Sequence, residues 1–186
     1  MMCTGSEAER KIVIFCSASY EIDPKFNQAA REVVRAACSL GYTIVSGGAV
    51  KGTMGVVADE IVACGGVHIG VLPRFMAVYR HPSLSETVWT DTMAERKEKM
   101  REGTCAAVAL PGGIGTLDEL IETLTLAKLD IYKGQVIALN IDGFFNPLIA
   151  LLDHYVETGM LDSRSRSLIS FPQSVAELND LLREPF

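Results

Sequence analysis

The stretch Thr104–Glu119, TCAAVALPGGIGTLDE, joins an apolar run to three glycines and then to a helical pattern. The uninterrupted apolar run is typical of a strand buried on both faces of a parallel sheet. Glycines let the backbone approach a ligand closely, and the free N–H groups at a helix start favour an anion such as phosphate. The stretch therefore predicts a strand, a phosphate-binding turn and a helix, with an ordinary tight turn as the alternative.

The same alternation of short apolar runs and longer helical patterns extends along the chain in both directions. Strands are expected over Lys11–Ser17, Tyr42–Ser46, Val67–Leu72, Thr87–Thr90, Thr104–Leu110, Gln135–Leu139 and Leu168–Ser170. Helices are expected over Pro24–Leu40, Thr53–Cys64, Thr92–Glu102, Thr116–Ile131, Asn146–Thr158 and Val175–Leu182. This order predicts an α/β class, single-domain, Rossmann-like three-layer fold over residues 1–186, with a mostly parallel sheet, helices on both faces and a flexible N-terminus over residues 1–10.

Composition excludes several classes of protein. The 23 acidic and 17 basic residues give a net charge of −6, which argues against nucleic-acid and membrane-surface partners. A hydrophobic content of 48% excludes a disordered chain. The sequence lacks a signal-peptide pattern and an apolar run of ~20 residues, so a cytoplasmic location is expected. Its five cysteines are widely spaced, which indicates reduced, mostly buried thiols and no metal site.

A second glycine-rich loop, SGGAVKGTMG over Ser46–Gly55, also follows an expected strand. It resembles a phosphate-binding P-loop, but Thr53 follows Gly52 where that motif requires lysine. The first strand is followed by CSASY, which contains no glycine and does not fit a dinucleotide fingerprint. The two glycine loops together indicate a bound mononucleotide.

Glu119 has two interpretations. Thr116 and Glu119 fit a capping box, in which the glutamate only bonds the helix start. A carboxylate in the first helical turn should instead stay ionised near the dipole, which suits a nucleophile or a stabiliser of positive charge. On a helical wheel, Asp118, Glu122 and Thr125 lie together beside Glu119, opposite an apolar arc of Leu117, Leu120, Ile121 and Leu124.

The preceding helix supplies cations. Helical spacing places Arg96 and Lys97 on one face with Met93 and Met100. Buried cations need anionic partners, such as a ligand phosphate or Glu119, although both side chains could instead extend outward past the methionines. Thr92 and Glu95 fit a capping box and are interpreted as structural. The unpatterned stretch Pro73–Ser85 fits equally a flap over the site and a plain surface connection.

The SGGAVKGTMG loop, the MAERK segment and PGGIGTLDE together resemble the LOG ("lonely guy") family, whose members are often mislabelled lysine decarboxylases. The similarity covers nearly the whole chain. It implies a Rossmann-like homodimer that cleaves the N-glycosidic bond of cytokinin riboside 5′-monophosphates or AMP, releasing the base and ribose 5-phosphate. The resemblance implies that Arg96 and Glu119 are catalytic, and that the nucleotide-contacting positions are Lys97, Gly112, Gly113, Gly115, Thr116, Asp118 and Thr125. Gly47, Gly48, Gly52, Thr53 and Glu122 complete the expected substrate-binding set.

The chain departs from the family pattern at three places. Ala49 replaces the usual third glycine of its loop, and Asp118 stands where glutamate is common. Family members commonly carry Pro-Arg-Glu after the strand corresponding to Val67–Leu72, whereas this chain reads MAVYRH over 76–81.

The sequence thus predicts a hydrolase of purine nucleoside 5′-monophosphates that needs no metal or organic cofactor. Glu119 would stabilise or bond the oxocarbenium-like sugar, and Arg96 would orient Glu119 and the sugar hydroxyls. The decarboxylase name would require a lysine that holds pyridoxal phosphate, and no lysine stands out for that task. The alternative is a non-catalytic nucleotide or molybdenum-cofactor carrier.

Overall fold

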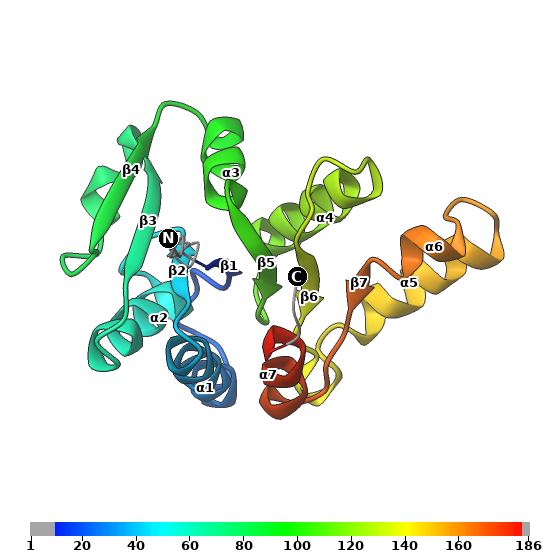
Figure 1. Ribbon diagram of the computed structural model, residues 1–186, viewed down its shortest axis with the longest axis horizontal. Helices are drawn as coiled ribbons and strands as arrows, with labels where there is room; N and C mark the ends of the chain where they lie inside the picture. The colour runs from blue at the N-terminus through cyan, green and yellow to red at the C-terminus, as the bar shows by residue number, and fades with distance from the viewer. Residues whose placement is uncertain (1–9, 184–186) are drawn as a thin grey trace, which may run out of the picture.

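The computed structural model describes residues 10–183, which fold around one seven-stranded sheet (Figure 1). The strands are β1 (Lys11–Phe15), β2 (Thr43–Ser46), β3 (His68–Pro73), β4 (Glu86–Thr90), β5 (Thr104–Ala109), β6 (Gln135–Ala138) and β7 (Ile169–Ser170). The α-helices are α1 (Pro24–Ser39), α2 (Gly52–Ala63), α3 (Met93–Arg101), α4 (Ile114–Lys128), α5 (Asn146–Glu157), α6 (Ser163–Arg166) and α7 (Val175–Arg183). Two 3₁₀ helices, η1 (Arg74–Tyr79) and η2 (Ile141–Gly143), complete the described elements. Of the N-terminus expected to be flexible, residues 1–9 lie outside the described part.

All the strand pairs are parallel, in the order β4-β3-β2-β1-β5-β6-β7. The chain progresses outward from β1 to one edge and then returns to β5 on the other side of β1. The order therefore reverses between β1 and β5, where an open α/β sheet has its ligand crevice beyond the carboxyl ends of the strands. The loops that follow β1 and β5 meet at this point.

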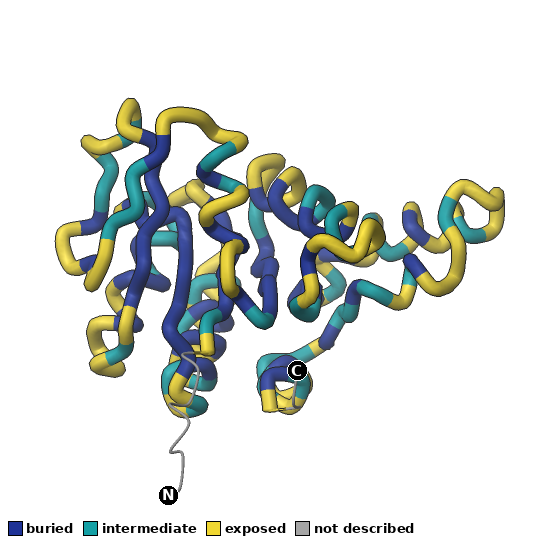
Figure 2. The backbone as a smooth tube through the Cα atoms, turned by 45° about the horizontal axis from the view of Figure 1, so that its top comes forward, coloured by how far each residue is buried: buried dark blue, intermediate teal, exposed yellow. Residues whose placement is uncertain are grey.

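The sheet separates two apolar cores. Ile12 and Ile14 pack beneath α1, α2 and α7, whereas Val13 and Phe15 face the side covered by α3, α4 and α5. The alternation follows from the strand period of two, and burial on both faces explains why the strands read as continuous apolar runs. Figure 2 shows the central strands as buried tube between exposed helical turns. The predicted fold class is confirmed.

The stretch Pro73–Ser85 is more than a plain surface connection, because it is bonded to the second glycine loop, and a role as a flap over the site stays a prediction. Its first part forms η1, and its end bonds the second glycine loop: Val50 N–H donates to Tyr79 O over 2.8 Å, and His81 N–H donates to Gly48 O over 2.8 Å. An isolated bridge joins Ala49 to Arg80. The segment was unpatterned because its order depends on contacts with a loop distant in sequence.

The expectation of mostly buried thiols is wrong for the four described cysteines. Only Cys16 is buried, whereas Cys38 and Cys105 are half-buried and Cys64 is exposed. All four are free thiols. None of the helices in residues 10–183 has the length and apolar character needed to cross a bilayer.

Candidate active site

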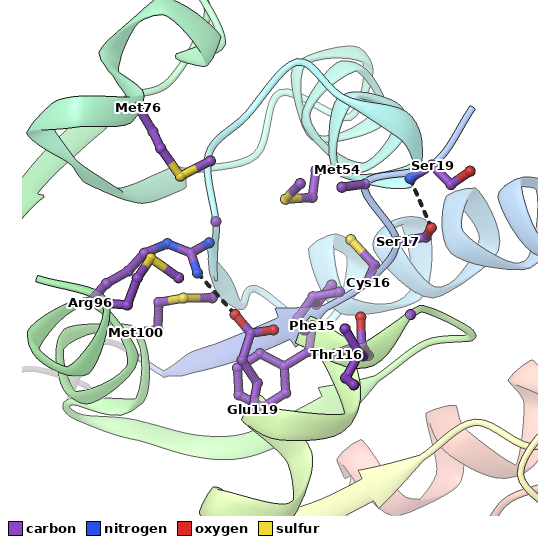
Figure 3. A pocket seen from close by; sticks show the side chains of 17 residues that line it. Phe15, Cys16, Ser17, Ser19, Met54, Met76, Arg96, Met100, Thr116 and Glu119 are labelled. Carbon is purple, nitrogen blue, oxygen red and sulfur yellow. Dashed lines mark hydrogen bonds and ion pairs between the residues drawn. The ribbon is translucent and has the colours of Figure 1, made fainter. Parts of the chain in front are cut away.

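A cavity of about 360 Å³ opens at the carboxyl ends of the central strands, where the strand order reverses. Its walls come from the turn after β1, the second glycine loop, η1, α3 and the start of α4 (Figure 3). The lining residues are Ile14, Phe15, Cys16, Ser17, Ala18, Ser19, Gly47, Met54, Met76, Met93, Arg96, Met100, Gly113, Ile114, Gly115, Thr116 and Glu119. The position is the one expected for a ligand in this class of fold.

Arg96 and Glu119 form a buried ion pair in the wall of this cavity. The Arg96 Nη1 donates to Glu119 Oε1 over 3.1 Å, and the Arg96 Nε donates to the Val71 carbonyl over 3.0 Å. Arg96 is 8% exposed and Glu119 is 9% exposed. Their side chains point toward each other from α3 and α4 (Figure 3). A pair with so little exposure is weakly screened by water, so its charges act strongly on anything bound beside it.

Local sequence explains why Arg96 points inward. Thr92 caps α3 by accepting a hydrogen bond from Glu95 N–H over 3.1 Å, which confirms the structural interpretation of these two residues. Arg96 and Met100 then fall one turn apart on the buried face of the helix. Gly47 makes room for the guanidinium, because a Cβ at this position would overlap Arg96 Nη2.

Glu119 is not part of a capping box. The helix begins at Ile114, two residues earlier than expected, so Thr116 lies within its first turn and does not cap it. Burial raises the pKa of the Glu119 carboxyl above its ordinary value, and the Arg96 guanidinium opposes this rise. The sequence predicted that Glu119 stays ionised because nearby positive charge stabilises its carboxylate. In the structure, the loss of hydration on burial has the larger effect on its pKa.

The start of α4 leaves backbone donors open to the cavity. Gly113 is its N-cap, and no side chain bonds the free N–H groups of the first turn. A Cβ at Gly112 would collide with the Thr116 side chain, whereas a Cβ at Gly113 or Gly115 would meet nothing within 4 Å. Gly112 therefore closes the turn, while Gly113 and Gly115 border free space that suits an anion at the helix N-terminus.

The second glycine loop contributes less to the cavity than expected. Gly47 and Met54 line it, but Gly48 packs against β3 with a positive φ of 64°. A Cβ at Gly52 would collide with the Ala18–Ser19 backbone, and Thr53 bonds Asn27 Oδ1 over 2.9 Å. Gly48, Gly52 and Thr53 thus shape the loop and do not line the cavity.

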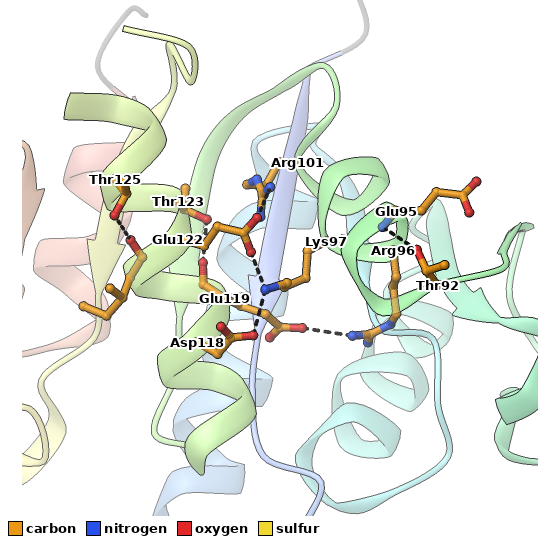
Figure 4. A network of polar contacts seen from close by, with 11 residues as sticks. Thr92, Glu95, Arg96, Lys97, Arg101, Asp118, Glu119, Glu122, Thr123 and Thr125 are labelled. Atoms are coloured by element: carbon orange, nitrogen blue, oxygen red, sulfur yellow. Dashed lines mark hydrogen bonds and ion pairs between the residues drawn. The ribbon is translucent and has the colours of Figure 1, made fainter. Parts of the chain in front are cut away.

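The remaining predicted residues, which are Lys97, Asp118, Glu122 and Thr125, line a second hollow of about 460 Å³ that shares Ile114 with the first. Figure 4 shows the polar contacts that these residues make. Lys97 Nζ bonds Asp118 Oδ2 over 2.9 Å and Glu122 Oε2 over 2.5 Å. Its side chain is 17% exposed and does not extend freely outward. Arg101 holds Glu122 from the other side over 3.1 Å, and Thr125 also lines the hollow.

The structure adds lining residues that sequence reasoning missed. Cys16, Ser17 and Ser19 follow β1, and Met76 reaches the cavity from η1 (Figure 3). Burial, aided by the negative charge of Glu119, raises the pKa of the Cys16 thiol, which stays protonated. The two serines could have been found from their position after the first strand of a parallel sheet, where ligands bind. They were overlooked because the turn that contains them has no glycine.

Known proteins share both the sequence pattern and the fold. Residues 54–182 match a family model described as possible lysine decarboxylase. The chain is 33% identical over 178 residues to the cytokinin riboside 5′-monophosphate phosphoribohydrolase LOG2 of Arabidopsis thaliana. The aligned region covers 94% of this chain and 83% of the relative. The chain is 35% identical over 172 residues to the cytokinin riboside 5′-monophosphate phosphoribohydrolase LOG of Oryza sativa subsp. japonica, with 91% and 71% covered. The chain belongs to the LOG family.

Solved structures that are less similar to this chain in sequence share its fold. The molybdenum cofactor binding protein from Rippkaea orientalis superposes with a TM-score of 0.72 at 20% identity, covering 96% of this chain and 98% of that one. The molybdenum cofactor carrier protein from Chlamydomonas reinhardtii gives 0.68 at 19% identity, covering 94% and 96%. Identities this low show the fold alone.

The decarboxylase description does not fit the cavity of this LOG-family chain. Pyridoxal phosphate requires a lysine for its Schiff base, and no lysine lies among the described residues that line the cavity. Lys97 is engaged by Asp118 and Glu122, and Lys51 lies 3.5 Å over the Tyr79 ring. Within residues 10–183, no group of three or more His, Cys, Asp or Glu residues could hold a metal ion.

Proposed function

We propose that this protein hydrolyses the N-glycosidic bond of cytokinin or purine nucleoside 5′-monophosphates, releasing the free base and ribose 5-phosphate. The observation that carries the proposal is the buried Arg96–Glu119 pair, which faces the same cavity as the open start of α4. One end of the cavity thus offers donors for a phosphate, and its wall offers a carboxylate for a sugar cation. Relatives named for this reaction are 33–35% identical over nearly the whole chain.

In this proposal the backbone N–H groups near Gly113 and Gly115 bind the 5′-phosphate, and Thr116 supplies a hydroxyl beside them. Fixing the phosphate fixes the ribose, so the anomeric carbon comes to rest near Glu119. Binding energy from a group that does not react is thereby used to position the group that does. Lys97, Asp118, Glu122 and Thr125, which line the adjoining hollow, would contact the nucleotide from its outer side.

Cleavage of the bond leaves positive charge on the anomeric carbon and the ring oxygen. The ionised Glu119 carboxylate stabilises that charge, either through space or by a covalent bond that water later breaks. Arg96 holds the carboxylate in place and donates to the sugar hydroxyls. Water finally adds its hydroxyl to the anomeric carbon, and its proton goes to the departing base. Because Glu119 acts as an anion, its raised pKa sets the acid limit of activity.

The alternative of a non-catalytic carrier needs only the glycine loops. It gives no reason to bury an arginine and a glutamate against each other in the cavity wall, since taking two charges out of water costs several kcal/mol per ion. The likeness to molybdenum cofactor proteins shows the fold alone. The ion pair therefore favours an enzyme.

The activity can be tested with purified protein and two substrates, AMP and N6-isopentenyl-AMP, by chromatographic detection of the free base and of ribose 5-phosphate. The proposal expects adenine or isopentenyladenine to appear in equal amounts with ribose 5-phosphate. Tight binding of either nucleotide without any release of base would favour the carrier instead. The ratio of the two rates identifies the preferred base.

We also infer a homodimer, which the family resemblance implies and an exposed apolar surface supports. Of the 12 residues of α5, only Leu152 is buried. Leu117 on α4 and Leu151 on α5 are 41% and 45% exposed, and a groove of about 520 Å³ between these helices contains both. Exposed apolar area of this kind is typical of a surface covered by another chain.

Light scattering after size exclusion tests the dimer. The wild-type chain should elute at twice the mass of one chain, and Leu151→Glu should shift it toward the monomer. Val62→Glu is a matched control, because Val62 is 51% exposed on α2 at the opposite face of the sheet. A monomeric wild type would contradict the inference. The cytoplasmic location stays a prediction from the amino-acid sequence.

A further inference from the structure

The cavity has two chemically different sides (Figure 3). Ser17 and Thr116 lie on one side, near the start of α4, where no side chain bonds the N–H groups of the first turn. Met76 and Met100 lie on the other side, together with Arg96. We call this second side the methionine wall, and its members are Met54, Met76, Met93 and Met100. The two sides are suited to different parts of a ligand.

The methionine wall is assembled from η1 and two helices. Met93 and Met100 flank Arg96 along α3, one about a turn before it and the other about a turn after it. Met54 lies in the first turn of α2. Its sulfur lies beside the same guanidinium, because a Cβ at Gly47 would stand 3.0 Å from Met54 Sδ and would also overlap Arg96 Nη2. Apolar side chains thus lie around the arginine of the ion pair.

Met76 completes the methionine wall from η1. It is half-buried, and none of the residues 74–79 that form η1 is buried. Backbone bonds at the end of η1 and just after it fix this segment. Val50 N–H donates to Tyr79 O over 2.8 Å, and His81 N–H donates to Gly48 O over 2.8 Å. A substitution at Met76 should therefore change the cavity without unfolding the protein.

A nucleotide bound as proposed above would turn its base toward the methionine wall. Its phosphate would lie at the start of α4 and its anomeric carbon near Glu119, so the base would extend past the ion pair. Arg96 is already engaged there, since its Nε donates to the Val71 carbonyl and its Nη1 to Glu119. The other polar side chains of the described lining lie on the opposite side and are Cys16, Ser17, Ser19 and Thr116 (Figure 3).

Apolar contact and hydrogen bonding discriminate between substrates to very different degrees. A site that hydrogen-bonds a substrate group rejects an analogue without that group by about 10⁴–10⁵-fold, because the polar atoms of the site lose their partner. An apolar pocket discriminates by only about 10–200-fold between substrates that differ by one small group. Methionine is also unbranched and flexible, so it adapts to groups of different shape. A base that meets methionine side chains is therefore recognised by its size and apolar surface.

We propose that the methionine wall binds the purine by apolar contact and does not read the group at C6. This inference rests on the proposed reaction and names its substrate class, which is purine nucleoside 5′-monophosphates with an amino, alkylamino or oxo group at C6, or with hydrogen alone. The 6-oxo member is IMP, and the unsubstituted member is purine riboside 5′-monophosphate. In each case the N-glycosidic bond breaks, the hydroxyl of water joins the anomeric carbon, and the proton of water goes to the released base.

The first test compares kcat/KM for AMP, IMP and purine riboside 5′-monophosphate with the purified, full-length protein. Chromatography measures the release of adenine, hypoxanthine or purine. We expect the values for IMP and for purine riboside 5′-monophosphate to lie within about 200-fold of the value for AMP. A decrease of more than about 200-fold for either nucleotide would show that a hydrogen bond reads C6, and it would overturn the inference.

Substitution of Met76 tests whether the base lies against the methionine wall. Met76→Ala should lower kcat/KM for AMP and IMP alike, by about tenfold, because it removes apolar contact that both bases share. Phe75→Ala is the matched control, because Phe75 is 67% exposed on η1 and does not line the described cavity, so it should cleave both nucleotides at the wild-type rate. Melting curves check that both variants fold. The inference fails if Met76→Ala cleaves both nucleotides at the wild-type rate, or if it loses the cleavage of IMP alone.

The failure of this inference can be distinguished from the failure of the proposed reaction. Cleavage of AMP together with rejection of IMP would support the reaction and overturn only the inference. If none of the nucleotides is cleaved, the proposed reaction fails, and isothermal titration calorimetry decides the inference. Dissociation constants for AMP and IMP within about 200-fold of each other would support apolar contact. A larger difference, or no binding of either nucleotide, would overturn it.

Discussion

The guanidinium of Arg96 holds the carboxylate of Glu119 at 3.1 Å while it also bonds the backbone carbonyl of Val71. The arginine belongs to helix α3 and is bonded to strand β3, so its side chain is fixed. Its bond to the carboxylate therefore holds a side chain of α4 in place. A carboxylate held in this way loses little orientation when a substrate binds.

Activity should fall on acidification at a pH above the ordinary glutamate value of about 4.3. Burial raises the pKa of Glu119, and the reaction needs the ionised form, so kcat/KM declines as the pH falls through that raised value. Because Arg96 lowers the pKa of Glu119, Arg96→Gln should move the acid limb of its residual activity to still higher pH. The pKa of the substrate phosphate, near 6, is common to both proteins, so an unchanged limb in the variant would contradict this assignment.

Gly47→Ala should reduce kcat/KM by about 10²-fold without unfolding the protein. The added methyl group overlaps the Arg96 guanidinium and forces it away from Glu119, and displacements near 1 Å at a reacting centre have effects of this size. Circular dichroism and melting curves serve as the control for folding. Wild-type turnover by this variant would show that the position of Arg96 is not critical.

Gly115→Ala should separate stability from phosphate binding. No atom lies within 4 Å of the new methyl group, and alanine stabilises a helix by roughly 0.8–1 kcal/mol relative to glycine. The variant should therefore melt at the same or a higher temperature. The methyl group also enters the space proposed for the phosphate, so inhibition by ribose 5-phosphate should weaken about tenfold, a loss of about 1.4 kcal/mol. Unchanged inhibition would place the phosphate elsewhere.

The stability of the fold should fall between pH 6.5 and pH 4 because of His68. Burial lowers the pKa of this histidine from 6.5 to about 4, and its Nε2 lies 2.7 Å from Ser46 Oγ. In that interval the unfolded chain binds a proton that the folded chain does not, so acidification favours unfolding by up to about 3 kcal/mol. Urea unfolding as a function of pH should show this slope in the wild type and a smaller one in His68→Gln. His154→Gln, at an exposed position, is the matched control and should retain the full slope.

The parallel fold could be predicted from the sequence, because strands that are buried on both faces consist of short, continuous apolar runs. The start of α4 could not be predicted in the same way. The sequence there fits a capping box, but the actual N-cap is a glycine, which has no side chain that would mark it as a cap. The wheel of α4 also grouped Leu117 with Leu120, yet only Leu120 is buried. Which apolar residues a helix buries depends on its rotation against the sheet, which local sequence does not record.

Single residues of the site could be predicted from the sequence, but the contacts that bring them together could not. The charges of Arg96 and Glu119 could be matched from helical spacing, since each required a partner if buried. The docking of η1 and the entry of Met76 into the cavity depend on backbone bonds to Gly48 and Val50, which no local pattern indicates. Contacts between segments that are distant in sequence can be identified only in the folded structure.

The most direct test of the proposed reaction is the release of free base from AMP by Glu119→Gln, measured beside the wild type at the same pH. Glutamine keeps the size of the side chain and an oxygen for Arg96, but it carries no negative charge to stabilise the sugar cation. We expect a folded protein that still binds AMP and releases adenine at least about 10²-fold more slowly. Release of adenine at the wild-type rate by a folded Glu119→Gln protein would contradict it.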